Sequence, residues 1–276
     1  MKIALAGTSF ELRSSSERIL AAARDHFRGF ESDAPASWTV DLDERGPLTI
    51  GGEAGVLVGA RHDGRWTFTL KHEISMRVDP ITRTAHAALG AVPELFPPGS
   101  VQNLLRILLV LELAPKGGVL LHASATSEGA IAFFGPSGAG KSTLARGFAE
   151  GTLLSDEIVC VDGAGLAHRA PFTGEHLPPR VPLAVPLRAL VAIDHGDSLR
   201  LSRLAPNDAL RRLLPCVVNV ATDRTLTAQI FDNAAALVRR VPTLRAALPR
   251  LPDDPGATRA QFSALLNHVA QAVALC

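Results

Sequence analysis

A glycine-rich stretch in the middle of the chain carries the residue types that bind phosphate. Residues 135–142 read GPSGAGKS and satisfy the pattern GxxxxGK[ST] in full. Glycines let the backbone turn tightly and aim its N–H groups at an anion. Lys141 can reach the outer phosphates, and the Ser142 hydroxyl suits Mg²⁺. The alternative is a purely structural glycine loop. We expect a nucleotide-binding loop made of Gly135, Pro136, Ser137, Gly138, Ala139, Gly140, Lys141, Ser142 and Thr143.

Two adjacent carboxylates follow this loop at short range. Asp156 and Glu157 come fifteen and sixteen residues after Lys141, just beyond the apolar pair Leu153 and Leu154. If that pair begins a strand of the same sheet, the strand ends on the loop's side, where open α/β sheets bind ligands. One carboxylate could then face Mg²⁺ while a free carboxylate accepts a proton from a hydroxyl group. The alternative is a pair of solvated loop acids.

The flanking sequence indicates the elements that would position these groups. An apolar strand at 130–134 enters the loop, and a helix is expected from Gly140 to about Glu150. Upstream, the segment VLLHASAT at 119–126 predicts a second strand, which a Ser-Glu-Gly turn joins to the strand at 130–134. Downstream, we expect a buried strand at 187–193 and helices at 206–214, 233–240 and 257–274.

The first hundred residues read as a strand-rich domain. Trp66, Phe68 and Leu70 alternate with polar residues, and the same parity continues through Ile74, Met76 and Val78, which is typical of a half-buried sheet. His72 falls in the apolar phase and is interpreted as a turn or core residue rather than a ligand. Turn residues at 97–100 favour a boundary there, which gives domains 1–98 and 99–276. The segment VQNLLRILLVLELA that follows predicts a buried helix.

Three motifs together resemble the HPr kinase/phosphorylase family, whose nucleotide core is shared with phosphoenolpyruvate carboxykinase. They are LLHASA at 120–125, GPSGAGKST at 135–143 and LLSDE at 153–157, and the resemblance covers roughly residues 100–195. It implies an α/β fold whose phosphate-loop core contains a mixed sheet. The strand-rich N-terminal domain does not resemble that of those enzymes.

The resemblance also assigns roles to single residues. Asp156 matches the acid that acts as general base toward a seryl hydroxyl, and as acid in the reverse direction. His122, nineteen residues before Lys141, matches a strand histidine that would orient Asp156 or touch phosphate. Glu175, in APFTGE, resembles a catalytic-loop glutamate that assists Mg²⁺, and Arg180 is a candidate phosphate contact. The implied catalytic residues are Asp156, His122 and Lys141, and the implied Mg²⁺ ligands are Ser142, Asp156, Glu157 and Glu175.

The sequence also departs from that family. Glu157 stands where bacterial HPr kinases have aspartate, and the arginine-containing signature that accompanies phosphorylase activity is not found. The chain is therefore identified as a divergent member, similar to kinases of lasso-peptide precursors. The implied function is ATP- and Mg²⁺-dependent transfer of the γ-phosphoryl group to a Ser or Thr hydroxyl of a peptide or small protein. A small-molecule kinase on the same core and a nucleotide-binding adaptor remain alternatives, and the donor is open between ATP, GTP and pyrophosphate.

The amino-acid composition argues against nucleic acid and membranes as binding partners. The 276 residues include 28 Lys and Arg against 27 Asp and Glu, so the formal net charge of +1 gives no electrostatic case for nucleic acid or an anionic membrane. Cys160, Cys216 and Cys276 have no metal-ligand spacing and suggest a reducing compartment. The longest apolar runs are far shorter than a membrane span. We expect a cytoplasmic protein, and the family resemblance adds a homo-oligomer as an expectation.

Overall fold

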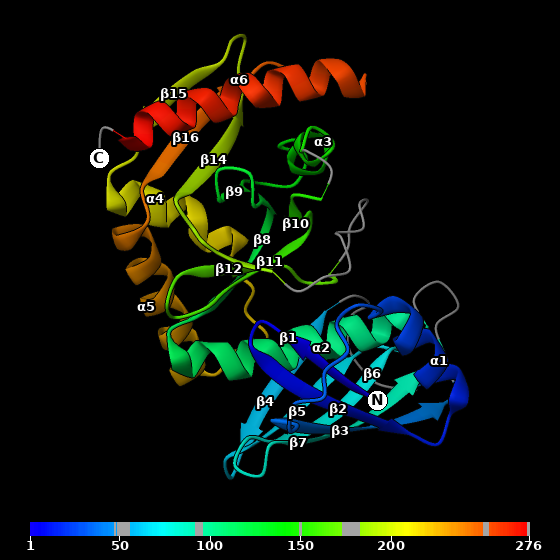
Figure 1. The fold of residues 1–276 in the computed structure, drawn as a ribbon. Helices are drawn as coiled ribbons and strands as arrows, with labels where there is room; N and C mark the ends of the chain where they lie inside the picture. Colours follow the sequence, from blue (N-terminus) through cyan, green and yellow to red (C-terminus); the bar gives the residue numbers. More distant parts are fainter. Residues whose placement is uncertain are drawn as a thin grey trace. The chain divides into compact units, whose positions relative to one another are not determined.

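The computed structural model describes residues 1–46, 48, 56–91, 96–148, 151–172, 183–250 and 254–274 (Figure 1). Contacts between residues divide the chain into two compact units. One comprises Met1–Pro115 with Asn219–Ala228, and the other comprises Lys116–Val218 with Gln229–Cys276. The sequence predicted a division between residues 98 and 99, whereas the observed division follows Pro115. The helix α2 (Pro98–Leu113) lies between these two points and packs against α1 (Glu17–His26) within the first unit.

The N-terminal unit contains a seven-stranded mixed sheet in the order β1-β2-β3-β7-β6-β5-β4, in which β2, β3 and β7 run parallel. Its strands are β1 (Lys2–Leu5), β2 (Thr8–Ser14), β3 (Trp38–Arg45), β4 (Leu57–His62), β5 (Arg65–Leu70), β6 (Ile74–Asp79) and β7 (Thr84–Gly90). The predicted alternation is confirmed, because Trp66, Phe68, Ile74, Met76 and Val78 are all buried while Arg77 is exposed.

Two further features of this unit bear on the sequence predictions. The predicted buried helix is confirmed as α2, in which the buried Glu112 accepts a hydrogen bond from Trp38 Nε1 at 2.9 Å. His72 lies in the turn between β5 and β6 with a φ of 65°, exposed, and its Nδ1 is 2.9 Å from the carbonyl oxygen of Leu48. The turn interpretation of His72 is therefore correct. The helix α1 was not predicted.

The second unit is built on a nine-stranded mixed sheet in the order β13-β12-β11-β8-β9-β14-β16-β15, with β10 also paired to β8. Only β9, β14 and β16 form parallel pairs among its described ladders. Its strands are β8 (Val119–Thr126), β9 (Ile131–Phe134), β10 (Leu153–Ser155), β11 (Ile158–Val161), β12 (Leu166–His168), β13 (Ala184–Pro186), β14 (Ala189–His195), β15 (Arg200–Arg203) and β16 (Thr243–Leu248). The chain is thus an α/β protein with mixed sheets, as predicted.

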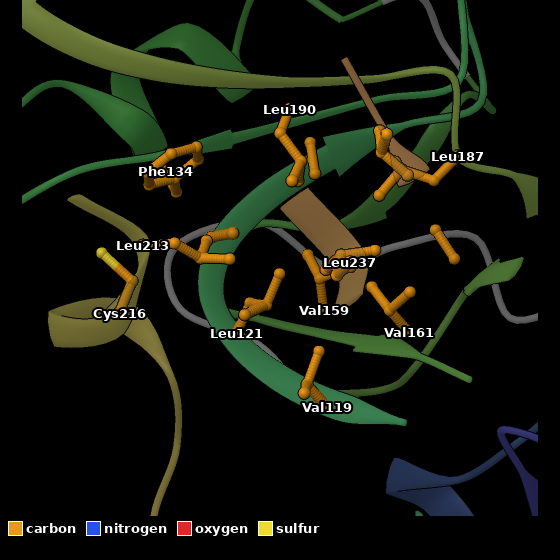
Figure 2. Close-up of a cluster of buried hydrophobic side chains, with 14 of the residues drawn as sticks. Val119, Leu121, Phe134, Val159, Val161, Leu187, Leu190, Leu213, Cys216 and Leu237 are labelled. Atoms are coloured by element: carbon orange, nitrogen blue, oxygen red, sulfur yellow. The ribbon is translucent and has the colours of Figure 1, made fainter. Parts of the chain in front are cut away.

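Helices cover both faces of this sheet, because alternate residues of its central strands point to opposite sides. They are α3 (Lys141–Ala145), α4 (Pro206–Leu213), α5 (Arg224–Arg240) and α6 (Pro255–Ala274), and the short 3₁₀ helices η1 (Ala114–Lys116) and η2 (Leu214–Cys216) complete the chain. On one face Phe134 packs in a cluster with Leu213 of α4 and Leu237 of α5 (Figure 2). On the other face Phe133 packs with Leu144 of α3 and Phe262 of α6.

The helix after the phosphate loop is shorter than predicted. It ends at Ala145 and turns through Phe148, whereas the sequence indicated a helix to about Glu150; residues 149 and 150 lie outside the described range. Just past this end the chain packs closely against α6, since a Cβ at Gly147 would lie 2.9 Å from the Phe262 Cβ and 3.1 Å from the Thr258 carbonyl oxygen. Of the other predicted helices, 206–214 and 257–274 are confirmed, and 233–240 is the end of a longer α5.

No helix among the described residues is long and apolar enough to cross a bilayer.

The aromatic cluster between α6 and the sheet should dominate the stability of the second unit. Phe262 is fully buried, with its ring centroid 5.9 Å from that of Phe133 and 4.8 Å from that of Phe148. We expect Phe262→Ala to lower the free energy of unfolding by about 3–5 kcal/mol, because it removes buried surface and leaves a cavity. Phe231→Ala on α5 is the control, since Phe231 is 46% exposed and should cost no more than about 0.5 kcal/mol. Equal urea-denaturation shifts for the two variants would contradict this assignment of the core.

Candidate functional site

The phosphate-loop sequence forms a tight turn between β9 and α3. Gly138 and Gly140 have φ of +78° and +94°, the left-handed region that favours glycine. At Gly135 the constraint is space, because a Cβ there would lie 2.9 Å from the carbonyl oxygen of Ile193 on β14. All three glycines of the motif are thus required by the backbone of this turn, and such a turn exposes N–H groups to an anion.

Lys141 is held over the turn that precedes it. Its Nζ donates to the carbonyl oxygens of Gly135 at 2.9 Å and Pro136 at 3.0 Å. Burial lowers the pKa of Lys141 below its ordinary value, and the neighbouring Cys216 acts in the opposite direction. The ammonium group is therefore partly desolvated, which strengthens its attraction to an anion at the loop.

Cys216 is a neighbour of the loop that sequence analysis did not identify. It is buried at the end of η2, and its Sγ lies 3.5 Å from the carbonyl oxygen of Gly135. Burial raises the pKa of the Cys216 thiol, although Lys141 partly offsets the shift. Cys160 and Cys216 are both buried free thiols. A neutral thiol beneath the loop completes the packing there, and no motif in the sequence points to it.

The acidic pair lies at the same height on the sheet as the end of β9. β9 and β10 both run antiparallel to β8, so their C-terminal ends share one edge. Ala123 of β8 pairs with Phe134 of β9, and on its other side its N–H donates to the Glu157 carbonyl oxygen at 3.1 Å. The backbones of Phe134 and Glu157 are therefore two strand spacings apart, or about 10 Å. The expectation that the strand at 153–154 joins the same sheet is confirmed.

His122 belongs to the same edge. It pairs with Ile158 of β11, and the register of β8 against β9 brings it level with Gly135 at the start of the loop. His122 is exposed, whereas its neighbours Leu121 and Ala123 are buried. The three motifs singled out in the sequence therefore lie at one level of the sheet, with β8 between the loop and the acids.

Ser155 shapes the bend that presents the acids. It is fully buried, and its Oγ accepts hydrogen bonds from the N–H groups of Glu157 at 3.2 Å and Ile158 at 3.0 Å. The same hydroxyl donates to the carbonyl oxygen of Phe172 at 3.3 Å. Asp156 is 2% exposed and Glu157 is half-buried. A serine directly before the acidic pair was the sequence signal for this bend, and the sequence analysis overlooked it.

Of the four predicted Mg²⁺ ligands, Ser142, Asp156 and Glu157 lie within the described residues. Within the described ranges, no three His, Cys, Asp or Glu side chains gather into a group that could hold a metal ion. The oxygen donors of Ser142 and Asp156 suit Mg²⁺, which is commonly held by one or two protein ligands together with substrate phosphates and water. These oxygen donors therefore suit an Mg²⁺ ion that is bound partly by phosphate oxygens better than an ion held by protein ligands alone. Glu175 and Arg180 lie outside the described residues.

The end of β14 adds His195 to the loop's surroundings. His195 Nε2 lies 3.2 Å from the Gly138 carbonyl oxygen. Its neighbour Asp194 accepts hydrogen bonds from Arg245 and from Arg212, the latter at 3.0 Å to each carboxylate oxygen. Burial raises the pKa of Asp194, but these two arginines outweigh it and hold the pKa below its ordinary value. The signal was an apolar strand ending in Asp-His, at the strand end where open sheets bind ligands.

Comparisons with known proteins add nothing to this geometry: no protein-family model matches the chain, and no curated protein matches its sequence.

The bend at the acidic pair should depend on the Ser155 hydroxyl. We expect Ser155→Ala to lower the free energy of unfolding by about 1–3 kcal/mol, because two buried N–H groups lose their acceptor. Hydrogen exchange at the amides of Glu157 and Ile158 should accelerate. Ser127→Ala is the control, since its half-buried hydroxyl donates to the Thr152 carbonyl oxygen at 3.2 Å in the adjoining turn. Unchanged exchange at both amides would show that Ser155 does not hold the bend.

Stability should also depend on pH through Asp194. A carboxyl whose pKa is lower in the folded than in the unfolded chain stabilises the fold above the unfolded value, about 3.9, and loses that contribution as the pH falls through the folded value. Asp194→Asn should therefore be less stable than wild type at pH 7, and the gap should narrow by pH 3, as measured by urea denaturation. The exposed Asp232→Asn serves as the control and should show no such convergence. A gap that is constant between pH 7 and pH 3 would contradict the role of the two arginines.

Proposed function

We propose that this protein is a kinase that transfers the γ-phosphoryl group of a nucleoside triphosphate to a hydroxyl group of a peptide or small protein. The observation that supports the proposal is a shared level in the sheet: the glycine-rich loop after β9 and the pair Asp156 and Glu157 lie at one height, on either side of β8. A cationic loop and a carboxylate on neighbouring positions of one sheet would supply both phosphate binding and proton transfer.

The loop would hold the donor's phosphates. Its backbone N–H groups would surround these phosphates, and Lys141 supplies a positive charge that is already partly desolvated. The carbonyl oxygens of Gly135 and Pro136 that hold this ammonium group would compete with phosphate for it. Ser142, the next residue, contributes a hydroxyl oxygen.

Asp156 would act on the acceptor. As the acceptor hydroxyl oxygen forms its bond to the γ-phosphorus, the bond from that phosphorus to the oxygen bridging the β- and γ-phosphates breaks. The hydroxyl proton passes to the Asp156 carboxylate, and the nucleoside diphosphate leaves with the bridging oxygen. This role as general base follows the resemblance to HPr kinases, as does an orienting role for His122.

A divalent cation fits the remaining oxygen donors. Mg²⁺, when bound, would neutralise charge on the β- and γ-phosphates. Ser142, Asp156 and Glu157 are the described residues that would hold it, and Glu175 is the further ligand that the resemblance implies. Since Asp156 and Glu157 are adjacent, one carboxylate can serve the metal while the other remains a base.

The acceptor class comes from the resemblance rather than from the geometry. HPr kinases phosphorylate a seryl hydroxyl, and the similar kinases of lasso-peptide precursors act on a serine of the precursor. We accordingly propose a seryl or threonyl peptide as substrate and the cytoplasm as the place of reaction. A homo-oligomer belongs to the same proposal.

Replacing the proposed base should separate binding from transfer. The protein is co-expressed with each small peptide encoded beside its gene, and mass spectrometry identifies a peptide that gains one phosphate. With that peptide, Asp156→Asn should still bind ATP but transfer phosphate about 10²- to 10⁴-fold more slowly, because a general base contributes a factor of that order. Lys141→Ala should weaken ATP binding roughly 10- to 150-fold through loss of a charge-assisted hydrogen bond.

The control is Asp208→Asn, an exposed acid on α4, which should leave both properties unchanged. Unchanged turnover in Asp156→Asn would remove Asp156 as the base. ATP binding without any phosphorylated product would favour a nucleotide-binding adaptor, and a phosphorylated metabolite in place of a peptide would favour a small-molecule kinase.

A further inference from the structure

Ser124 of β8 is a fully buried serine whose hydroxyl group has no hydrogen-bond partner among the described residues. A hydroxyl that is removed from water without a hydrogen bond raises the free energy of the folded chain. Such a group in a native structure needs an explanation, and one explanation is a partner that it acquires during function. Ser124 lies two residues after His122 in the same motif, yet the proposed reaction gives it no role.

The strand register places Ser124 opposite Asp156. The pairs on either side of Asp156 share one offset against β8, and they are Ser155 with Ala125 and Ile158 with His122. The backbone hydrogen bond that the Glu157 carbonyl oxygen accepts from β8 follows the same offset. Opposite residues of an antiparallel pair point to one face of the sheet, with Cβ atoms about 4.5–5.5 Å apart. That separation lets the hydroxyl reach the carboxylate by rotation of the two side chains about their Cα–Cβ bonds.

Asp156 is the buried polar neighbour that this register offers. On the β9 side, Ser124 pairs with Phe133, whose ring has no polar atom and packs in the cluster beneath α3. On the same face of β8, the Thr126 hydroxyl already donates to another threonine at 3.0 Å, and His122 is exposed. Asp156, by contrast, is 2% exposed. A hydrogen bond between a hydroxyl and a carboxylate at such burial is shielded from water, which makes it strong.

We propose that Ser124 is a positioning residue, whose hydroxyl donates a hydrogen bond to one oxygen of the Asp156 carboxylate in the complex with donor and acceptor. The inference rests on the proposed kinase function and deepens it. The other carboxylate oxygen then faces the acceptor and takes its proton, while the hydroxyl proton of Ser124 stays on Ser124. Hydrogen bonds of this kind are often poorly aligned without substrate and tighten in the reactive complex. Fixing the carboxylate matters because phosphoryl transfer depends on orientation.

Kinetics with the peptide that gains phosphate test this role in wild type, Ser124→Ala, Asp156→Asn and the double variant. Ser124→Ala should lower kcat roughly tenfold, because one hydrogen bond to a charged group is lost. KM for ATP and for the peptide should stay unchanged, since Ser124 contacts neither. In the Asp156→Asn background the same substitution should change kcat less than about twofold, because the carboxylate that the hydroxyl serves is absent.

Stability separates positioning from packing. Removing a buried hydroxyl that has no partner should not lower the midpoint of urea unfolding, so Ser124→Ala should lose turnover without losing stability. Ser100→Ala is the matched control, because Ser100 is a fully buried serine in α2 of the first unit, and it should leave kcat unchanged.

The outcomes distinguish the inference from the function on which it rests. Equal kcat values for wild type and Ser124→Ala would overturn the inference while leaving the kinase function in place. A loss of kcat that is the same in both backgrounds, or that comes with a lower unfolding midpoint, would show that Ser124 acts through packing, which also overturns the inference. Wild-type protein that phosphorylates no peptide would overturn the proposed function and the role of Ser124 together.

Discussion

The approach of Gly135 to the backbone of Ile193 is the constraint on which the candidate site depends. A side chain at residue 135 would have to occupy space 2.9 Å from a carbonyl oxygen of β14, a distance that real Cβ atoms essentially never show. Because β9 and β14 are parallel neighbours in register up to Phe134 and Ala192, the loop leaves the sheet pressed against the next strand. The carbonyl oxygen of Gly135 accepts a hydrogen bond from Lys141 and lies next to Cys216. Farther along the loop, the Gly138 carbonyl oxygen lies beside His195.

β8 supplies the second constraint, which is a fixed spacing. It runs between the loop strand and the acidic bend and forms hydrogen bonds with both, so the separation of loop and acids is set by two backbone ladders rather than by flexible side chains. Ser155 then fixes the bend itself, because its Oγ accepts hydrogen bonds from the amides of Glu157 and Ile158. Positioning of this kind matters for phosphoryl transfer, because that chemistry depends on orientation and charge more than on covalent participation by the protein.

Because the sheet is mixed, the loop after β9 has an antiparallel strand, β8, on one side and a parallel strand, β14, on the other. On the antiparallel side, the bend between β10 and β11 places Asp156 and Glu157 beside β8 at the level of the loop. On the parallel side, β14 and β16 end at that same level and bring an imidazole and the guanidinium of Arg250. Hydrophobic clusters bury both faces of the sheet, and Figure 2 shows the one that contains Phe134 and Leu237.

The sequence by itself determined the elements whose pattern is local. The period-two run from Trp66 to Val78, the apolar helix α2 and the strand–loop–helix order around Lys141 were all readable, because each depends on neighbours a few residues apart. It also named the loop, His122 and the acidic pair as one candidate site. The end of α3, the domain division after Pro115 and the start of α5 were not readable, because packing of distant segments decides them, as Gly147 against Phe262 illustrates. Only the tertiary structure brought Cys216, His195 and Arg250 to the loop, since pairing across a sheet joins residues that no spacing along the chain can relate.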